Sequence, residues 1–248
     1  LTINTGIAIA NPNAQPAVVS YFFTNLAGTD VGNGSFGIPA NGQVARFLNE
    51  APFNAVANFP GTFTFTSDVP VAVTALRGFT NERSEFLLTT LPVTDLSAPS
   101  PAGTQLLAHY AEGGGWTTQI VLVNTTNAVL SGAIELVNSD GLLVRREEYF
   151  ITRRSSRKVV TFAPTTLTGS VRVVPDSGGT APISFNIFSF RPGGVTLASA
   201  GVPAVNGNTF RMYSEIVRTS GSAGSIQSGV ALANASATAA TASLVLYR

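Results

Sequence analysis

The sequence contains no cysteine, one histidine and one methionine, and few charged residues. Without cysteine, disulfide bonds, thiol chemistry and zinc sites with sulfur ligands are excluded. Charged residues make up 11% of the 248 positions, against about 25% in average proteins. The net charge is only +1, so no long-range field attracts nucleic acid or an anionic membrane, and we expect neither partner.

Long apolar runs are also absent. No stretch reaches the roughly 18 residues that a membrane-spanning helix needs, so we expect no membrane span. No charged and then apolar leader opens the chain. Low charge together with a mean hydropathy of +0.28 is unusual for a crowded cytoplasm, where net charge favours solubility. We therefore expect an extracellular or cell-surface protein.

One short pattern occurs three times along the chain. Residues 5–11 (TGIAIAN), 118–124 (TQIVLVN) and 228–234 (SGVALAN) each alternate apolar residues with small or polar ones and end in asparagine. These asparagines, at positions 11, 124 and 234, are 113 and 110 residues apart. Self-similarity at such a constant spacing indicates tandem structural repeats.

The residues between these patterns predict short antiparallel strands. In the second repeat, runs rich in Val, Ile, Phe, Thr and Tyr are separated by turn residues, and residues 138–141 (NSDG) are typical of a hairpin turn. No stretch shows a convincing helical period, so no helix is expected. The predicted strands of this repeat lie near 106–111, 117–124, 130–138, 142–151, 156–162, 169–174, 181–190 and 194–200.

Turn-rich stretches near 96–103 and 203–208 divide the chain. We predict an all-β fold of two tandem Ig-like antiparallel β-sandwich domains, residues 1–95 and 104–203, followed by a partial third repeat at 208–248. A strand ending at residue 112 precedes the second pattern, and one ending at residue 215 precedes the third. The first repeat lacks this strand.

No residue pattern predicts an enzyme, a cofactor or a metal site. His109 has no neighbouring set of ligands, and we interpret it as structural; a serine triad would need a carboxylate brought close by the fold. Residues 32–37 (GNGSFG) match a dinucleotide-binding pattern, but they lie between two β runs and open no helix, which predicts a turn. Asp176 lies in a glycine-rich loop that we interpret as solvated, with calcium binding as the alternative.

Basic residues are concentrated in one part of the second repeat. They could form a patch for an anionic partner such as an acidic glycan. The alternative, which we favour, is an exposed sheet face on which Glu135, Glu147 and Glu148 are cross-strand partners. The basic residues are Arg145, Arg146, Arg153, Arg154, Arg157 and Lys158.

Two further features concern carbohydrate. Asn33, Asn124 and Asn234 lie in Asn-x-Ser/Thr triplets, which accept N-linked glycans in exported proteins. Trp116 and Tyr110 flank the first strands of the second repeat. We interpret these aromatic residues as part of a core or a domain junction, and a sugar-binding platform is the alternative.

With these residues in view, the chain resembles the Ig-like β-sandwich repeats of bacterial secreted and cell-surface proteins. The resemblance rests on the strand type at 5–11 and its two later copies, and it covers nearly the whole chain. It implies an extracellular structural or adhesive role and carries no catalytic residues.

The partial third repeat leads to a sharper hypothesis. A sandwich without its first strand has an unpaired edge, and a strand from another copy can satisfy the backbone groups of that edge. We therefore expect a head-to-tail homopolymer, as in a filament or surface fibre. The residues expected in the assembly strands are Arg211, Tyr213, Val230, Leu232, Leu244 and Leu246.

Two alternatives are kept open. The first is a non-catalytic adhesin, carbohydrate-binding or spacer module of a larger secreted protein, which makes glycans a possible partner. The second is an all-β hydrolase whose site is assembled from dispersed residues around His109.

Overall fold

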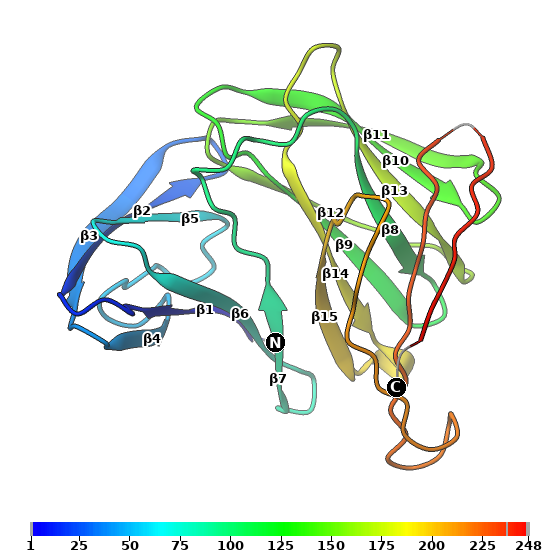
Figure 1. Cartoon of the computed structure of the whole chain (residues 1–248), viewed down its shortest axis with the longest axis horizontal. Helices are drawn as coiled ribbons and strands as arrows, with labels where there is room; N and C mark the ends of the chain where they lie inside the picture. The colour runs from blue at the N-terminus through cyan, green and yellow to red at the C-terminus, as the bar shows by residue number, and fades with distance from the viewer. Residues whose placement is uncertain (1, 237, 247–248) are drawn as a thin grey trace.

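The fold is described by a computed structural model that covers residues 2–236 and 238–246. In this part of the chain, fifteen strands and one short 3-10 turn, Pro192–Gly194, are formed. Every ladder between strands is antiparallel. The expectation of an all-β, antiparallel protein is therefore confirmed (Figure 1).

The first seven strands form two facing sheets, which we call the N-terminal sandwich. One sheet has the strand order β4-β1-β6-β7 and the other has the order β3-β2-β5. Alternation along β2 shows why one face of each sheet lines a core: Ala17, Val19 and Tyr21 are buried, and the residues between them are exposed. The strands are β1 (Thr2–Ala10), β2 (Ala17–Asn25), β3 (Asp30–Ile38), β4 (Gln43–Phe47), β5 (Gly61–Ser67), β6 (Ala72–Thr80) and β7 (Phe86–Leu91).

The next eight strands form the central sandwich. Its sheets have the orders β12-β9-β14-β15 and β11-β10-β13-β8. The predicted hairpin turn is present: the Gly141 amide donates to the Asn138 carbonyl oxygen (3.1 Å) and Gly141 has a φ of 83°. The strands are β8 (Gln105–Glu112), β9 (Trp116–Val123), β10 (Leu130–Asn138), β11 (Leu143–Ile151), β12 (Ser156–Val160), β13 (Leu167–Pro175), β14 (Ile183–Phe190) and β15 (Ala198–Pro203).

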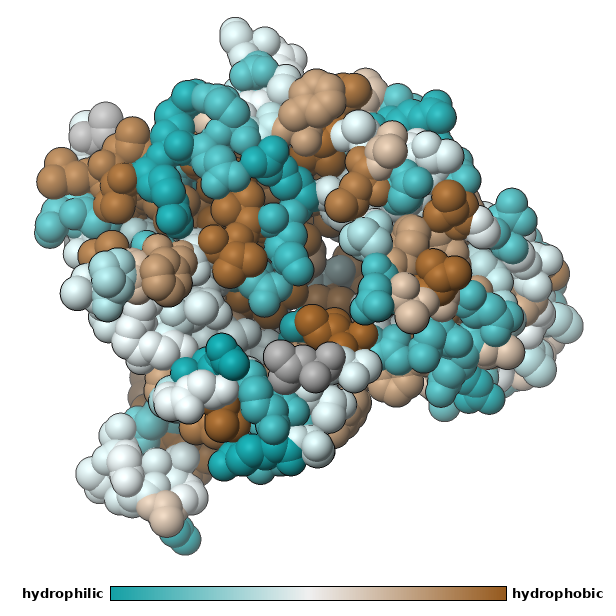
Figure 2. Space-filling view, turned by 180° about the vertical axis from the view of Figure 1, so that it is seen from behind, coloured by the Kyte–Doolittle hydropathy of each residue, from teal (hydrophilic) through white to brown (hydrophobic). Residues whose placement is uncertain are grey.

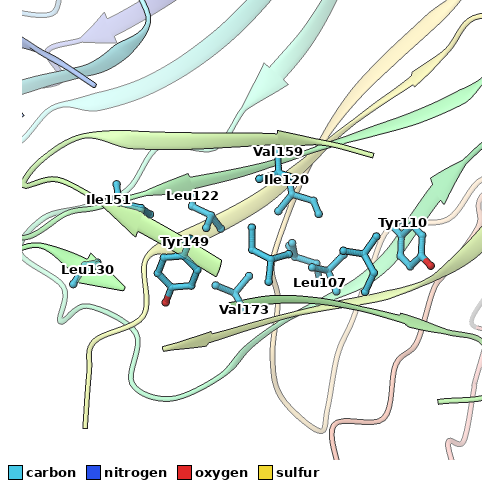
Figure 3. Packing of buried hydrophobic residues seen from close by; sticks show 12 residues of the cluster. Leu107, Tyr110, Ile120, Leu122, Leu130, Tyr149, Ile151, Val159 and Val173 are labelled. Atoms are coloured by element: carbon cyan, nitrogen blue, oxygen red, sulfur yellow. The ribbon is translucent and has the colours of Figure 1, made fainter. Parts of the chain in front are cut away.

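Each sandwich has its own hydrophobic core between its two sheets. In the central sandwich, Figure 3 shows Ile120, Leu122 and Tyr149 among the buried side chains that fill this space. The N-terminal core contains more aromatic rings, and the Tyr21 ring centroid lies 5.3 Å from that of Phe53. Burial of apolar surface in both cores supplies the main driving force for folding, because no disulfide bond contributes.

The two sandwiches share one strand order when β1–β7 are matched with β9–β15. In the N-terminal sandwich Tyr21 lies opposite Phe65, and in the central sandwich Ile134 lies opposite Val173. The central sandwich has one additional strand, β8, which pairs with β13. Among residues 2–236 and 238–246, no strand takes the corresponding place beside β5, which is therefore an edge strand.

The connection between β4 and β5 is longer than its counterpart in the central sandwich. It covers residues 48–60, against residues 161–166 between β12 and β13. Phe53 in this connection is buried in the N-terminal core, and Tyr21 Oη donates to the Pro52 carbonyl oxygen (2.6 Å). The connection thus adds aromatic side chains to the sandwich that has one strand fewer.

Polar contacts join the two sandwiches at two places. At the first, the turn before β12 meets the turn after β2. Arg154 Nη2 lies 2.7 Å from Asp30 Oδ2, and Ser155 Oγ donates to the Asn25 carbonyl oxygen (2.9 Å). Gly28 is required here: its φ is +76°, and a Cβ atom would lie 3.1 Å from the side chain of Thr152.

At the second place, the turn after β6 meets the segment between β14 and β15. Glu82 accepts hydrogen bonds from the Thr196 amide (2.7 Å) and Arg191 Nε (2.8 Å). The Thr196 amide, as the strongest contributor, and the Arg191 guanidinium lower the pKa of Glu82 from 4.5 to about 2. Strand β15 lies beside β7, where the Gly201 amide donates to Thr89 Oγ1 (2.9 Å). The two sandwiches are thus tied together at two separate points.

The C-terminal segment, which we define as residues 204–246, forms no strand among its described residues in this subunit, so the expected assembly strands stay a prediction. The only bridge among these described residues joins Val217 and Ile226. An alternating apolar pattern favours a strand, but a strand also needs a partner for its backbone groups. In this subunit the segment lies beside the central sandwich, and none of its described residues belongs to a ladder between strands (Figure 1).

Candidate assembly surface

The open edge of β5 is the first part of the candidate site. Phe63 and Phe65 of β5 point toward the N-terminal core but are only half-buried. Their counterparts in the central sandwich, Val171 and Val173, are completely buried next to β8. The hydroxyl of Ser67, at the end of β5, is buried and has no hydrogen-bond partner in the described structure. The edge therefore exposes unpaired backbone groups beside incompletely covered apolar side chains.

Strand β8 shows how the corresponding edge is covered in the central sandwich. Leu107 lies opposite Val171, and Tyr110 lies opposite Gly169. Gly169 leaves room for the Tyr110 ring, because a Cβ atom at this position would lie 2.9 Å from the ring. The Leu107 and Tyr110 side chains are both buried in the core. One strand therefore satisfies the backbone edge and supplies two apolar anchors.

A hydroxyl group holds β8 against β9. Thr118 Oγ1 accepts a hydrogen bond from the Ala111 amide (3.0 Å) and donates one to the Ala111 carbonyl oxygen (2.8 Å). All of these groups are buried. Because each partner is satisfied out of water, the pair of bonds fixes β8 relative to β9.

The C-terminal segment has a similar pair of bonds without the rest of a sandwich. Ser228 Oγ accepts from the Glu215 amide (2.8 Å) and donates to the Glu215 carbonyl oxygen (3.1 Å). Sequence reasoning missed this hydroxyl, although it was visible as Thr or Ser at the first position of all three repeated patterns. The segment therefore contains a hairpin closed by a hydroxyl, as in the central sandwich, but Glu215 aligns with Glu112, one residue beyond Ala111.

The predicted assembly residues all belong to this exposed segment. Tyr213 is 82% exposed, and apolar residues on both arms of the hairpin are also open to solvent. Figure 2 shows other apolar residues exposed among polar ones over the rear face, and a hollow between the two lobes. The structure gives no ladder to any of the six predicted residues, Arg211, Tyr213, Val230, Leu232, Leu244 and Leu246.

The three repeated asparagines form the same local turn. Asn11 Nδ2 donates to the Gln15 carbonyl oxygen (2.8 Å), Asn124 Nδ2 to that of Ala128 (2.7 Å), and Asn234 Nδ2 to that of Thr238 (2.6 Å). In the two sandwiches the asparagine also bonds to the end of a neighbouring strand, as Asn124 does to the Ile151 carbonyl oxygen (3.2 Å). The repeated asparagine is therefore a structural turn residue.

The side chain of Asn124 is buried, so this predicted glycosylation site is not accessible in the folded chain. Its Nδ2 atom bonds to three carbonyl oxygens, and the residue is 1% exposed. A glycan on Nδ2 would break these bonds. Asn33 on β3 and Asn234 in the C-terminal segment are exposed, and their modification stays a prediction.

The six predicted basic residues do not form one free patch. Three of them, on β11 and β12, have acidic partners, as expected for an exposed sheet face. The exposed pairs of Arg146 and Arg157 contribute about 0–1 kcal/mol each, whereas Arg145 reaches the buried carboxylate of Glu112 on β8. The pairs are Arg145 with Glu112 (3.4 Å), Arg146 with Glu135 (3.5 Å) and with Glu148, and Arg157 with Glu147 (2.7 Å).

Arg153 and Arg154 are used in the contact between the two sandwiches. Arg153 Nε donates to the Gly28 carbonyl oxygen (3.2 Å), and Arg154 bonds to Asp30. Lys158 is exposed on β12. Sequence reasoning did not find this role of Arg153 and Arg154, because the partners are more than a hundred residues away in the chain.

The aromatic side chains and His109 lie around one end of the central sandwich. The His109 ring stacks on Phe188, with centroids 5.6 Å apart, and desolvation lowers the pKa of His109. Within the described structure, no hydrogen bond joins its imidazole to a carboxylate. Trp116 is 38% exposed, and its ring centroid is 4.6 Å from that of Phe190.

Residues 32–37 lie on β3, where residues 33–37 pair with β2, so the prediction of a turn at this motif is wrong. No group of three His, Asp or Glu side chains that could hold a metal ion occurs in the described part of the chain. In the same residues, no helix is long and apolar enough to cross a membrane. A scan against protein-family models and a search of curated proteins find no match to this chain.

Proposed function

We propose that this chain is a non-enzymatic, extracellular structural protein of a bacterium, built from tandem Ig-like repeats, whose copies associate head to tail. The C-terminal segment of one copy adds a strand to the open β5 edge of the N-terminal sandwich of the next. One observation carries the proposal. Residues 210–215 (FRMYSE) resemble β8 (LAHYAE) and lie in a hairpin closed by the Ser228 hydroxyl, while no described strand pairs with the outer edge of β5.

Strand addition fits the physical chemistry of both surfaces. The β5 edge offers unpaired amides and carbonyl groups, and the segment offers an extended backbone with alternating apolar side chains. Both surfaces lie on every copy but at different places. A contact between two different surfaces propagates into a chain of subunits when it does not close into a ring.

The composition supports an exported location. A protein with few charged residues and exposed apolar residues on the C-terminal segment is prone to associate. In a fibre these residues are covered by the neighbouring subunit. Stability without cysteine rests on the two cores and on the polar contacts between the sandwiches.

Analytical ultracentrifugation and electron microscopy of the full chain test the proposal. We expect oligomers that lengthen with concentration, and we expect a chain ended after Asn206 to stay monomeric, because strand β15 and both sandwiches are complete before this residue. The full chain with Val56→Asp, a change at an exposed residue of the β4–β5 connection, is the matched surface control. Equal association of the full and shortened chains, or none by the full chain, contradicts the proposal.

A second candidate function is a carbohydrate-binding or spacer module of a larger secreted protein. The partly exposed Trp116, whose ring lies beside that of Phe190, favours it, because sugars bind on aromatic faces. A glycan array distinguishes this candidate: binding that is lost on Trp116→Ala but kept on Phe86→Ala, a change at another exposed aromatic residue, supports it. Absence of binding by the full chain contradicts it.

A further inference from the structure

Resting on the proposed function, we propose that the β5 edge receives one defined stretch of a second copy, residues 209–215, with Phe210 opposite Phe63 and Tyr213 over Gly61. In the free subunit, Phe59 holds the place that Tyr213 takes.

The sequence of the C-terminal segment selects the anchor residues. Residues 107–112 of β8 read LAHYAE, and residues 210–215 read FRMYSE. In β8 the first and fourth positions, Leu107 and Tyr110, are the large apolar side chains that are buried in the core beside β13. The same positions in the C-terminal segment are Phe210 and Tyr213, and both are exposed.

The shared strand order fixes the register on β5. Gly61 and Phe63 occupy the places in β5 that Gly169 and Val171 occupy in β13, because β2 and β10 pair with them in the same way. Tyr110 lies opposite Gly169, so Tyr213 falls opposite Gly61. A slip by one residue would turn Arg211 and Ser214 toward the core in place of the two aromatic anchors.

The space above Gly61 shows how the site is held in the free subunit. A Cβ atom on Gly61 would lie 2.1 Å from the Thr24 carbonyl oxygen and 2.7 Å from the Phe59 ring. A Cβ atom on Gly169 would meet Val137 and Tyr110 in the same way, at 1.9 and 2.9 Å. Both glycines therefore lie under an aromatic ring. The ring comes from β8 in the central sandwich and from the β4–β5 connection in the N-terminal one.

A hydroxyl at the matching position completes the receptor. Thr5 of β1 has the place that Thr118 has in β9, since both start the repeated pattern six residues before its asparagine. In the free subunit Ser228 bonds to the Glu215 backbone. In the proposed register the Thr5 hydroxyl of the next copy bonds one residue earlier, to the Ser214 backbone, because Ser214 aligns with Ala111, the partner of Thr118. Burial of Phe210 and Tyr213 supplies the driving force.

Disulfide trapping tests the register, because the chain has no cysteine of its own. One full-length variant carries Thr64→Cys and a second carries Thr209→Cys; these residues are opposite each other in the proposed register, and directly opposed strand residues are close enough for a disulfide. We expect a mixture of the two to form a disulfide-linked heterodimer at least about tenfold faster than a mixture with Thr66→Cys. Thr66 is the same residue type on the same face of β5.

Two further full-length variants test the anchors. We expect Tyr213→Ala to weaken self-association about tenfold or more without changing the melting temperature, because Tyr213 is exposed in the free subunit. We expect Phe59→Ala to strengthen association about threefold or more, because the site over Gly61 is then vacant. Thr5→Val, which keeps the shape and removes the hydroxyl, weakens association less than Tyr213→Ala.

The outcomes separate this inference from the function on which it rests. If the full chain associates but cross-links through Thr66→Cys as fast as through Thr64→Cys, the register is wrong and strand addition survives. If Phe59→Ala weakens association as Tyr213→Ala does, Phe59 does not occupy the Tyr213 site in the free subunit. If the full chain does not associate at all, both proposals fail.

Discussion

The N-terminal and central sandwiches have one strand order but close their cores in different ways. In the central sandwich β8 covers the edge of β13 and places Tyr110 over Gly169. In the N-terminal sandwich, the connection at residues 48–60 places Phe59 over Gly61, and no described strand pairs with the outer edge of β5. A loop can therefore supply side chains that a strand supplies elsewhere, but not the hydrogen-bonding groups of that strand.

The strongest test of this comparison removes the ring over each glycine. Because Tyr110 is completely buried, we expect Tyr110→Ala to lower the free energy of unfolding of the central sandwich by about 3–5 kcal/mol. Phe59 is only half-buried, so Phe59→Ala should cost the N-terminal sandwich about half as much. Urea unfolding of each variant measures both values. Equal losses would mean that the loop closes its core as completely as the strand does.

The repeated asparagines provide the second test. Asn124→Ala leaves three carbonyl oxygens without their donor, and we expect a loss of about 2–3 kcal/mol. Asn11→Ala should cost a similar amount, since Asn11 also bonds to three carbonyl oxygens and is equally buried. Asn234→Ala is the exposed control, with an expected change within about 0.5 kcal/mol. A large loss from Asn234→Ala in the isolated subunit would show that the third turn is already part of a folded core.

The contact between the two sandwiches leads to a pH-dependent prediction. The pKa of Glu82 is lowered from 4.5 to about 2 in the folded chain, mainly by the Thr196 amide. Because the folded-state pKa is lowered, the ionised Glu82 carboxylate stabilises the contact fully above pH 4.5. This stabilisation is lost as the pH falls toward 2. We expect small-angle scattering to show a larger radius of gyration over this interval. Glu82→Gln should have the larger radius already at pH 7 and change less on acidification.

Much of the fold could be predicted from local pattern. The spacing of Asn11, Asn124 and Asn234 reflects a turn whose bonds are mostly local, and alternation along the strands reflects one buried face. The roles of Phe59 and Arg154 could not be predicted, because they depend on partners placed by the tertiary fold. In the C-terminal segment, the alternating pattern favours strands. A strand also needs a partner strand, and the local pattern does not specify which one.

The smallest expected effect concerns one hydroxyl group that distinguishes the two cores. Tyr149 has the place in the central sandwich that Phe36 has in the N-terminal one, since they lie opposite Gly132 and Val19. The Tyr149 hydroxyl is buried without a hydrogen-bond partner in the described structure, and burial raises the pKa of Tyr149 to about 12.

Replacing Tyr149 by Phe makes this position alike in both sandwiches. Removing an unsatisfied buried hydroxyl should leave the free energy of unfolding unchanged or raise it by up to about 1 kcal/mol at pH 7. A raised tyrosine pKa also means that its stabilising contribution is present below pH 10 and is lost as the pH rises toward 12. We therefore expect Tyr149→Phe to lose less stability than the natural chain between pH 10 and 12 in urea titrations. If Tyr149→Phe lowers the free energy of unfolding by more than about 1 kcal/mol at pH 7, the hydroxyl has a hydrogen-bond partner, such as a buried water molecule. The hydroxyl would then stabilise the central core in a way that Phe36 does not stabilise the N-terminal one.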